Sequence, residues 1–331
     1  MTTMPALRIQ EDSPYLVSWL AHLEYTDRRR LLPAGVCPVD TVRSLQFAPP
    51  GYTAEDWMVP GGHVAAGVLR LLLPPSGAPT MPVLGLSTYG TGDTGAVRHE
   101  LLAVAHRRAA ERGSIPVGSH EVAYAEGTAL NEAKLENRLP QGVTWNPTTP
   151  IAIRQVLELG APLEVPGLSD SYEMIMWGTV TPDAYLRSCS RLELTMGGGG
   201  EDKYVEPERL EDTHTAGVER MRRGRGRHAY HTGIVDLKSN TLVGFTSVSL
   251  TASVADRAYQ GMTVVDYKHR GRGLGAVLKL ANLRQLRAAE PHVRQVETTN
   301  DHSNASMLAL NRACGYRAVS CLLPWKIEGS P

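Results

Sequence analysis

The sequence predicts a mixed α/β protein built from two successive domains of similar design. The chain has 331 residues, about twice the length of an ordinary domain. Segments with strand and helix periodicity follow one another in the same order in each half. In the second half, an apolar strand, a glycine-rich turn and an amphipathic helix stand in direct succession over 262–286. We therefore expect two tandem domains, each a twisted mixed sheet flanked by helices.

In the first half, two helices are expected before any long strand, and a Pro/Gly hairpin joins the first strand pair. In chain order we predict helices over 13–32 and 39–47, strands over 63–73 and 81–88, a helix over 96–112, a strand over 115–122 and a helix over 128–137. A stretch rich in proline and glycine comes next, so we divide the chain into a first domain (1–150), a linker (151–170) and a second domain (171–331).

The second half repeats this order. We predict a strand over 173–180, a helix that begins at the Thr181-Pro182-Asp183 signal, a helix over 207–222, hairpin strands over 228–236 and 242–251, a strand over 259–265, a helix over 276–286 and a strand over 293–299. A final short helix then precedes Gly315-Tyr316.

The composition narrows the class of protein. The chain is 42% hydrophobic and 21% charged, and its 34 basic residues equal its 34 acidic ones, so no global field favours nucleic acid or an anionic membrane. No secretory signal opens the sequence, and the longest apolar run, 64–73, is far shorter than the roughly 20 residues that span a bilayer. The four cysteines lack metal-ligand spacing: Cys37, Cys189, Cys314 and Cys321. We expect a cytoplasmic protein without a metal site.

The turn between strand and helix in the second half has the features of a phosphate site. It reads Arg270-Gly271-Arg272-Gly273-Leu274-Gly275. Glycines allow backbone conformations that expose successive N–H groups, and a helix N-terminus adds a positive dipole end. The two arginines add charge-assisted hydrogen bonds. A solvated basic turn is the alternative interpretation of the same residues.

Together with the strand and helix that come after it, this turn resembles the acyl-CoA pyrophosphate loop of the GNAT (GCN5-related) N-acyltransferases. The match consists of Arg270-x-x-Gly273-x-Gly275 after an apolar strand, then a second strand, an asparagine-started helix and Gly315-Tyr316. The resemblance implies that Arg270 to Gly275 hold the pyrophosphate and that the backbone of Val264 and Val265 contacts the pantetheine arm and the thioester carbonyl. It also places Asn300 and Asn304 near the coenzyme, although Asn304 could equally be a helix cap.

The first half lacks this chemistry at the corresponding turn. Its sequence, Tyr89-Gly90-Thr91-Gly92-Asp93-Thr94-Gly95, contains no basic residue and has an aspartate where a phosphate would be repelled. We expect a degenerate, structural first domain, with a retained ligand pocket as the alternative. The second domain is expected to bind acyl-CoA and to be catalytic.

The catalytic acid and base are less well marked. Many members of the family carry a tyrosine four residues before the Gly-Phe or Gly-Tyr pair, and Asn311 stands there in this chain. Asparagine can hydrogen-bond sulfur but cannot act as an acid. The strand residues 259–263 include no carboxylate, so Glu297, His231 and Asp266 are the candidate bases.

The resemblance implies transfer of an acyl group from acetyl-CoA or a longer acyl-CoA to an amine, and we expect the amine of a small molecule, such as an amino sugar or a peptide-like natural product. The tandem arrangement resembles that of mycothiol-forming acetyltransferases and of antibiotic-tailoring acyltransferases, so a role in antibiotic biosynthesis or resistance is expected. We expect a monomer or homodimer that binds neither nucleic acid nor membrane. The alternatives are a mycothiol-type acetyltransferase and an inactive acyl-CoA-binding sensor or scaffold.

Overall fold

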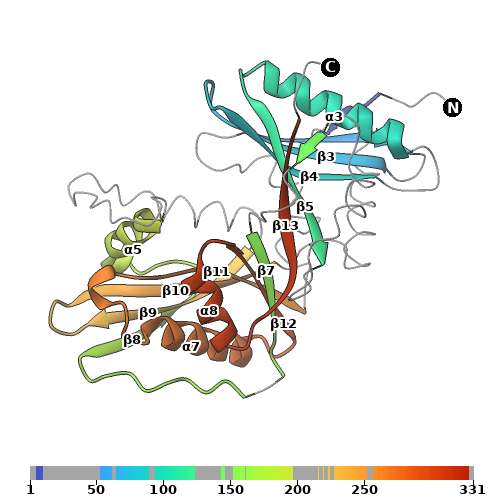
Figure 1. Cartoon of the computed structure of the whole chain (residues 1–331). Coiled ribbons are helices and arrows are strands. Elements are labelled where there is room, and N and C mark those ends of the chain that lie inside the picture. Colours follow the sequence, from blue (N-terminus) through green and yellow to red (C-terminus); the bar gives the residue numbers. More distant parts are fainter. Residues whose placement is uncertain are drawn as a thin grey trace. The chain divides into compact units, whose positions relative to one another are not determined.

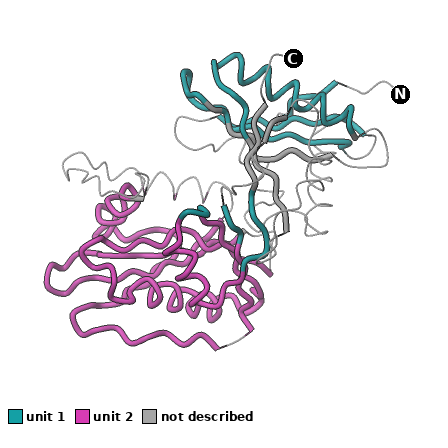
Figure 2. The backbone as a smooth tube through the Cα atoms, viewed as in Figure 1, with its two compact units in different colours: residues 1–154, 301–303, 318–331 teal, residues 155–300, 304–317 magenta. Residues whose placement is uncertain are grey.

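The computed structural model describes two compact units, which are treated separately (Figure 2). Unit 1 comprises Met1–Arg154, Asp301–Ser303 and Ala318–Pro331, and unit 2 comprises Gln155–Asn300 and Asn304–Arg317. The residues that the structure describes are 5–9, 53–61, 65–88, 94–123, 143–145, 152–160, 162–196, 215, 219, 223, 227–251 and 256–327. Within them, no helix is long and apolar enough to cross a membrane.

Unit 1 is a sheet of mostly antiparallel strands with a helix packed against it. Its strands follow the order β1-β2-β3-β4-β5-β13, with β6 beside β13, and only β4 and β5 pair in parallel. Their bounds are β1 (Leu7–Ile9), β2 (Thr53–Pro60), β3 (Ala65–Leu73), β4 (Thr80–Thr88), β5 (Ile115–Ala123), β6 (Val143–Trp145) and β13 (Arg317–Ile327). The helix is α3 (Thr94–Ala110).

The core of unit 1 is built on β3, along which buried and partly buried residues alternate strictly. Every second residue of β3 is buried, and Leu69, Leu71 and Leu73 form one cluster with Leu101 and Val104 of α3. Alternate residues of a strand share a face, so these leucines mark the face that the helix covers. Burial of such side chains is the main favourable term in folding.

Unit 2 is a second mixed sheet with helices on both faces. Its strands follow the order β7-β12-β11-β10-β9-β8, in which β11 and β12 are parallel while β8 to β11 are antiparallel. The strands are β7 (Ala152–Glu158), β8 (Tyr172–Trp177), β9 (Arg227–Asp236), β10 (Thr241–Thr251), β11 (Arg257–Val265) and β12 (Gln295–Asp301). The helices are α5 (Asp183–Met196), α7 (Leu274–Ala289) and α8 (Ala305–Ala313), with a 3-10 turn, η2 (Tyr267–His269), before α7.

The two faces of this sheet have separate cores. On one face, Leu192 of α5 packs with Trp177, Phe245 and Val264. On the other, Val277 and Leu278 of α7 pack with strand residues, including Ile234, in a separate cluster. Figure 1 shows α5 on one side of the sheet and α7 on the other. We call these the α5 face and the α7 face.

The observed elements confirm the mixed α/β class and most of the predicted strands and helices. The structure adds strands that were not predicted from the sequence: β1, β2, β6 and β7. Strand β13 follows α8, as the resemblance to a final strand–helix–strand unit implies. The predicted helices over 13–32, 39–47 and 128–137 lie outside the described residues, and so does the helix over 207–222 apart from Thr215 and Glu219, which are helical.

The observed division also differs from the predicted one in two places. Strand β7 falls within the segment predicted to be a linker, and Ala318–Pro331 groups with unit 1 rather than with the second domain. Prolines explain the first difference, because Pro150 and Pro162 flank β7 and are loop signals. The second difference follows from strand pairing, because β13 pairs with β5 of unit 1 from Ser320 to Lys326.

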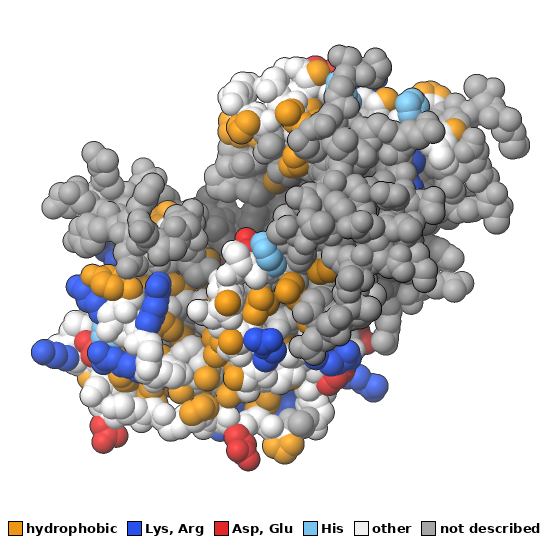
Figure 3. All heavy atoms as spheres, viewed as in Figure 1, with side chains coloured by type: hydrophobic (Ala, Val, Ile, Leu, Met, Phe, Trp, Pro, Cys, Tyr) orange, Lys and Arg blue, Asp and Glu red, His pale blue; other side chains and the backbone are white. Residues whose placement is uncertain are grey.

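The surface of unit 2 carries both signs of charge. Figure 3 shows lysine and arginine side chains interspersed with acidic ones on the face in view. Basic and acidic side chains, which are equal in number in the sequence, therefore both occur on this part of the described surface.

Candidate active site

The glycine-rich turn links β11 to α7 in a conformation that only glycine adopts freely. Gly271 and Gly273 have φ angles of 75° and 74°, and Gly273 is the N-cap of α7. A Cβ on either glycine would meet nothing within 4 Å, so the requirement is for the left-handed backbone and not for space. The first backbone N–H groups of a helix have no partner inside the helix. The turn therefore presents N–H donors at the positive end of α7, as an anion site requires.

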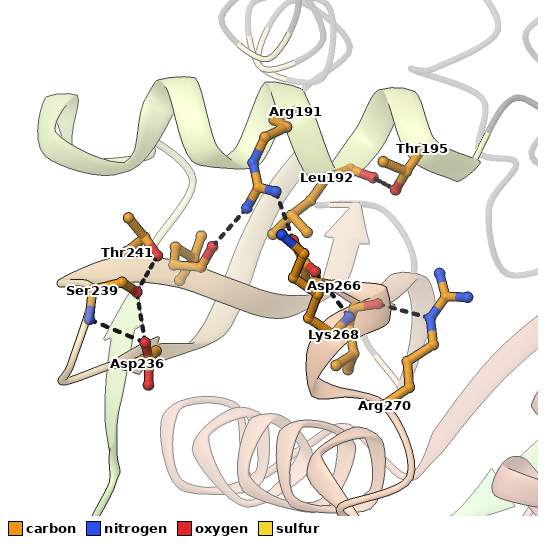
Figure 4. A network of polar contacts seen from close by, with 11 residues as sticks. Arg191, Leu192, Thr195, Asp236, Ser239, Thr241, Asp266, Lys268 and Arg270 are labelled. Atoms are coloured by element: carbon orange, nitrogen blue, oxygen red, sulfur yellow. Dashed lines mark hydrogen bonds and ion pairs between the residues drawn. The ribbon is translucent and has the colours of Figure 1, made fainter. Parts of the chain in front are cut away.

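Asp266 and Arg191 brace the start of this turn (Figure 4). Asp266 accepts hydrogen bonds from the Lys268 backbone N–H at 3.1 Å and from Arg191 of α5 at 2.6 Å. Burial raises the pKa of Asp266, but the bonds from Arg191 and from the Lys268 backbone outweigh it, so that the pKa lies below its ordinary value. Asp266, one of the three candidate bases, is therefore an anion whose hydrogen bonds stabilise the turn.

The arginines of the turn are exposed and lightly tethered. Arg270 donates from Nε to the Val265 carbonyl at 3.0 Å (Figure 4). Arg272 donates to the Tyr172 hydroxyl at 2.7 Å, and that hydroxyl also lies 3.0 Å from Nδ1 of His269. Exposed guanidinium groups beside a fan of N–H donors suit a diphosphate.

Next to the turn, β11 and β12 separate. Their parallel pairing covers Arg257–Gln295, Ala258–Val296 and Tyr259–Glu297. Beyond these pairs, β11 runs on to Val265 and β12 to Asp301, and the described residues show no further register pair between them. We call the point where the pairing ends the vertex. There, the Thr298 hydroxyl donates to the Gln260 carbonyl at 3.3 Å.

Only the backbone of β11 faces this opening. The other edge of the strand stays paired with β10, through Val264 opposite Phe245 and Val265 opposite Gly244. The Val264 side chain lies in the core of the α5 face, and Val265 packs against the core of the α7 face. The Asp266 N–H donates to the Val243 carbonyl of β10, so Val264, two residues earlier, also directs its backbone groups to β10, and Val265 directs its own into the opening. An amide and thioester chain between the strands would therefore meet the main chain of Val265, and the contact that the resemblance implies for Val264 is not available.

A β-bulge changes the direction of β11 next to the vertex. Thr246 is opposite Thr263 and Val248 is opposite Gln260, so β11 has one more residue than β10 between these pairs. Gly261 lies in this stretch, and a Cβ there would come within 2.6 Å of the Ser247 hydroxyl oxygen. Bulges are frequent beside active sites because they redirect the strand. Here the bulge requires glycine for space.

Glu297 lies at the vertex on the α5 face. It is opposite Tyr259 in the parallel register and only 4% exposed. Burial raises the pKa of Tyr259, the charge of Glu297 raises it further, and Arg227 partly offsets both. The register therefore places Glu297 beside Tyr259, at the base of the opening.

His231 occupies the same face but a different part of it. It is opposite Ser247 on β10, its ring stacks on Trp177 with centroids 5.2 Å apart, and its Nδ1 lies 2.8 Å from the Gly178 carbonyl. A carbonyl only accepts, so Nδ1 carries the proton. Three strand spacings, roughly 14 Å, separate β9 from β12. The structure therefore brings His231 and Glu297 to one face without placing them together.

The α7 face carries the other group of polar side chains. Asn311 is fully buried and donates to Gln155 at 2.7 Å, while its Oδ1 has no hydrogen-bond partner among the described residues. Tyr316, 2% exposed, donates to the Gln260 side chain at 3.4 Å. Lys279 lies over the Tyr316 ring, with Nζ 5.6 Å from its centroid. This group faces the vertex from the side opposite Glu297.

The two remaining predicted asparagines have local partners. Asn304 is the N-cap of α8 and accepts from the Met307 backbone N–H at 3.1 Å, so the helix-cap interpretation is confirmed. Asn300 of β12 donates to the Thr298 hydroxyl at 3.4 Å. A coenzyme contact by either residue stays a prediction.

Sequence reasoning missed Lys279, Gln155 and Gln260. The sequence could have indicated Lys279, because this charged residue interrupts an otherwise apolar stretch of α7 one turn after Gly275. It could not have indicated Gln155 or Gln260, because the role of a glutamine in a strand depends on partners that only the structure shows. In the part of the chain that the structure describes, no cluster of three or more His, Cys, Asp or Glu residues could hold a metal ion.

Comparison with known proteins relates the whole chain to one family. No protein-family model and no curated protein matches the sequence. Among solved structures, a tandem GNAT protein from the clavulanic acid biosynthesis pathway is 34% identical, with a TM-score of 0.84 and 98% of each chain covered.

Two further structures share the fold at lower identity. A GCN5-related N-acetyltransferase from Sphaerobacter thermophilus is 17% identical, with a TM-score of 0.59 over 99% of this chain and 98% of that one. A GNAT-family acetyltransferase from Colwellia psychrerythraea is 14% identical, with a TM-score of 0.54 over 98% of this chain and all of that one. These two structures share the fold, and the 34% identity over 98% of the chain shows the family: this chain belongs to the GNAT family of acyltransferases, with two tandem GNAT domains.

Proposed function

We propose that this chain is an acyl-CoA-dependent N-acyltransferase whose catalytic site lies in unit 2. The observation that carries the proposal is the combination of two features in one unit: the glycine-rich turn at the N-terminus of α7 and the separation of β11 from β12 beside it. A coenzyme A thioester has a diphosphate at one end and an amide-containing arm that ends in the thioester. Its two ends match these two features, and the GNAT fold family uses acetyl-CoA.

The acceptor that we propose is the amine of a small molecule, such as an amino sugar or a peptide-like natural product. The similar structure at 34% identity belongs to a protein of the clavulanic acid biosynthesis pathway, which is a small-molecule pathway. The zero net charge also gives no long-range attraction for an acidic or basic macromolecule. The donor is acetyl-CoA or a longer acyl-CoA, and the protein acts as a monomer or homodimer. Unit 1 has a structural role in this proposal.

In the proposed reaction the amine attacks the thioester carbonyl directly. Glu297 accepts the proton that the attacking amine must lose, from the α5 face of the vertex. The backbone N–H of Val265, on the edge of β11 that does not pair with β10, stabilises the oxyanion, a contribution of about 3–4 kcal/mol per donor. The turn from Arg270 to Gly275 fixes the diphosphate, so that much of the rate comes from positioning.

Release of free thiol tests this function. We expect the full chain to release coenzyme A from acetyl-CoA, or from an octanoyl thioester, when it is offered a panel of amino sugars and aminoacyl compounds, with one amine well above the hydrolytic background. Mass spectrometry of the product should show the amide. Binding of both thioesters without thiol release for any amine would contradict the proposal and favour a sensor or scaffold, and a product from the mycothiol precursor amine would identify the mycothiol-type alternative.

A further inference from the structure

Lys279 is a buried cation that has no part in the attack of the amine on the thioester. It lies in the second turn of α7 with 1% of its surface exposed and has apolar neighbours along the helix, including Leu278 and Leu283. The titratable groups that face it in the described structure are Cys314 and Tyr316, both from the segment that ends α8 and enters β13. No carboxylate pairs with it among the described residues.

Such a placement costs the fold stability. An ammonium group taken out of water without a counter-ion is strongly disfavoured, and burial accordingly lowers the pKa of Lys279 to about 8, with only a small opposing effect of Cys314. The ring of Tyr316 offers a weak partner through a cation–π contact. Unpaired buried charges of this kind are concentrated at functional sites, because packing alone gives no reason to keep them.

The position of Lys279 relates it to the leaving group rather than to the acceptor. Tyr316, beneath its ammonium, contacts Gln260 at the vertex, and Asn311 lies buried on the same α7 face. Glu297 approaches the vertex from the opposite α5 face. A thioester held between β11 and β12 would therefore have a carboxylate on one side and this group of polar side chains on the other.

The departing sulfur needs a positive charge or a proton on that side. Asn311, at the position where the family resemblance places a tyrosine, can only hydrogen-bond. Burial raises the pKa of Tyr316 above its ordinary value, so its hydroxyl is a poor acid. Among the described residues of this polar group on the α7 face, Lys279 is the one that carries a positive charge.

We propose that Lys279 stabilises and protonates the thiolate that leaves coenzyme A; this inference rests on the proposed function. The amine nitrogen forms a bond to the thioester carbon, and its proton passes to Glu297. The carbon–sulfur bond then breaks, its electron pair stays on sulfur, and sulfur takes a proton from the Lys279 ammonium. Solvent takes the proton from Glu297 and returns one to Lys279, so charge and protons balance over the cycle.

Titration of bound coenzyme A tests this role without an acceptor amine. The ultraviolet absorbance of the thiolate would be followed against pH for coenzyme A alone and in complex with the full chain. The variants are Lys279→Met and Lys279→Gln, with Lys238→Met as the matched control, because Lys238 lies in the exposed turn between β9 and β10. We expect the complex to lower the thiol pKa, the two Lys279 variants to weaken thiol acidity by about tenfold or more relative to wild type, and the control to match wild type.

The outcomes separate the two proposals. If wild type binds coenzyme A and the Lys279 variants leave the thiol pKa unchanged, the role of Lys279 is overturned while the proposed function stands. If wild type does not bind coenzyme A at all, the proposed function fails first and this inference fails with it. Turnover adds a second readout: the Lys279 variants should lower kcat with little change in the KM for acyl-CoA, and a purely structural lysine would not give that split.

Discussion

Replacing Glu297 with glutamine should lower kcat/KM by at least about a hundredfold, because the variant keeps the shape of the side chain and loses the proton acceptor. Glu297 is the buried carboxylate at the point where β11 and β12 separate, directly opposite Tyr259. General-base catalysis typically contributes about a hundredfold to ten-thousandfold. The measurement is thiol release against pH with the best acceptor amine, and the acidic limb of the wild-type profile should be absent from the variant.

The matched control is Glu158→Gln. Glu158 is also on a strand of unit 2, but its side chain is half exposed and it lies near Gln295 and Arg317 rather than at the vertex. It should retain wild-type activity. If Glu297→Gln stays within threefold of wild type, Glu297 is not the base, and the same experiment on His231→Gln becomes decisive, because His231 is the other predicted base on the α5 face.

Lys279→Met should stabilise the protein by about 3 kcal/mol at pH 7. The folded state lowers the pKa of Lys279 from 10.5 to about 8, and each pKa unit corresponds to about 1.4 kcal/mol. A base with a lowered pKa binds its proton less well when folded, so wild type carries the full penalty below pH 8 and regains stability as the pH rises from 8 to 10.5. Replacing a buried charge with an apolar side chain of similar length removes that penalty.

Unfolding curves at pH 7 and pH 9.5 measure this effect. The advantage of Lys279→Met over wild type should be large at pH 7 and smaller by about half or more at pH 9.5. Lys238→Met, an exposed substitution, should match wild type at both pH values. A Lys279→Met protein that unfolds more readily than wild type at pH 7 would show that the ammonium is paired and structural, which contradicts the burial argument.

The sequence predicts the elements whose patterns are local. Alternation along β3 and the glycine-rich turn before α7 are both visible in one short stretch, and the structure has both where the sequence places them. Strand β7 is missed because the prolines beside it are loop signals. The pairing of β13 with β5, as in Ser320 opposite Ala123, is not predicted because it joins residues far apart in the chain. A local pattern cannot report a distant partner.

The same limit applies to the site. The residues of the turn are predictable because glycine and arginine at fixed spacing carry their own meaning. That Glu297 and His231 share a face follows only from the register of four strands. The contacts of Lys279 and Asn311 depend on how α7 and α8 pack: Gly275 has Leu310 within 3.0 Å of the place where a Cβ would stand.

The central claim is that the turn from Arg270 to Gly275 binds acyl-CoA, and calorimetric titration of acetyl-CoA tests it most directly. The proteins are the full wild-type chain, the double variant Arg270→Ala/Arg272→Ala, and Arg284→Ala, an exposed arginine farther along α7. We predict that wild type and Arg284→Ala bind alike and that the double variant binds at least tenfold more weakly, a loss of about 1.4 kcal/mol. If wild type does not bind, or if the double variant binds as tightly as wild type, the turn is not the coenzyme site.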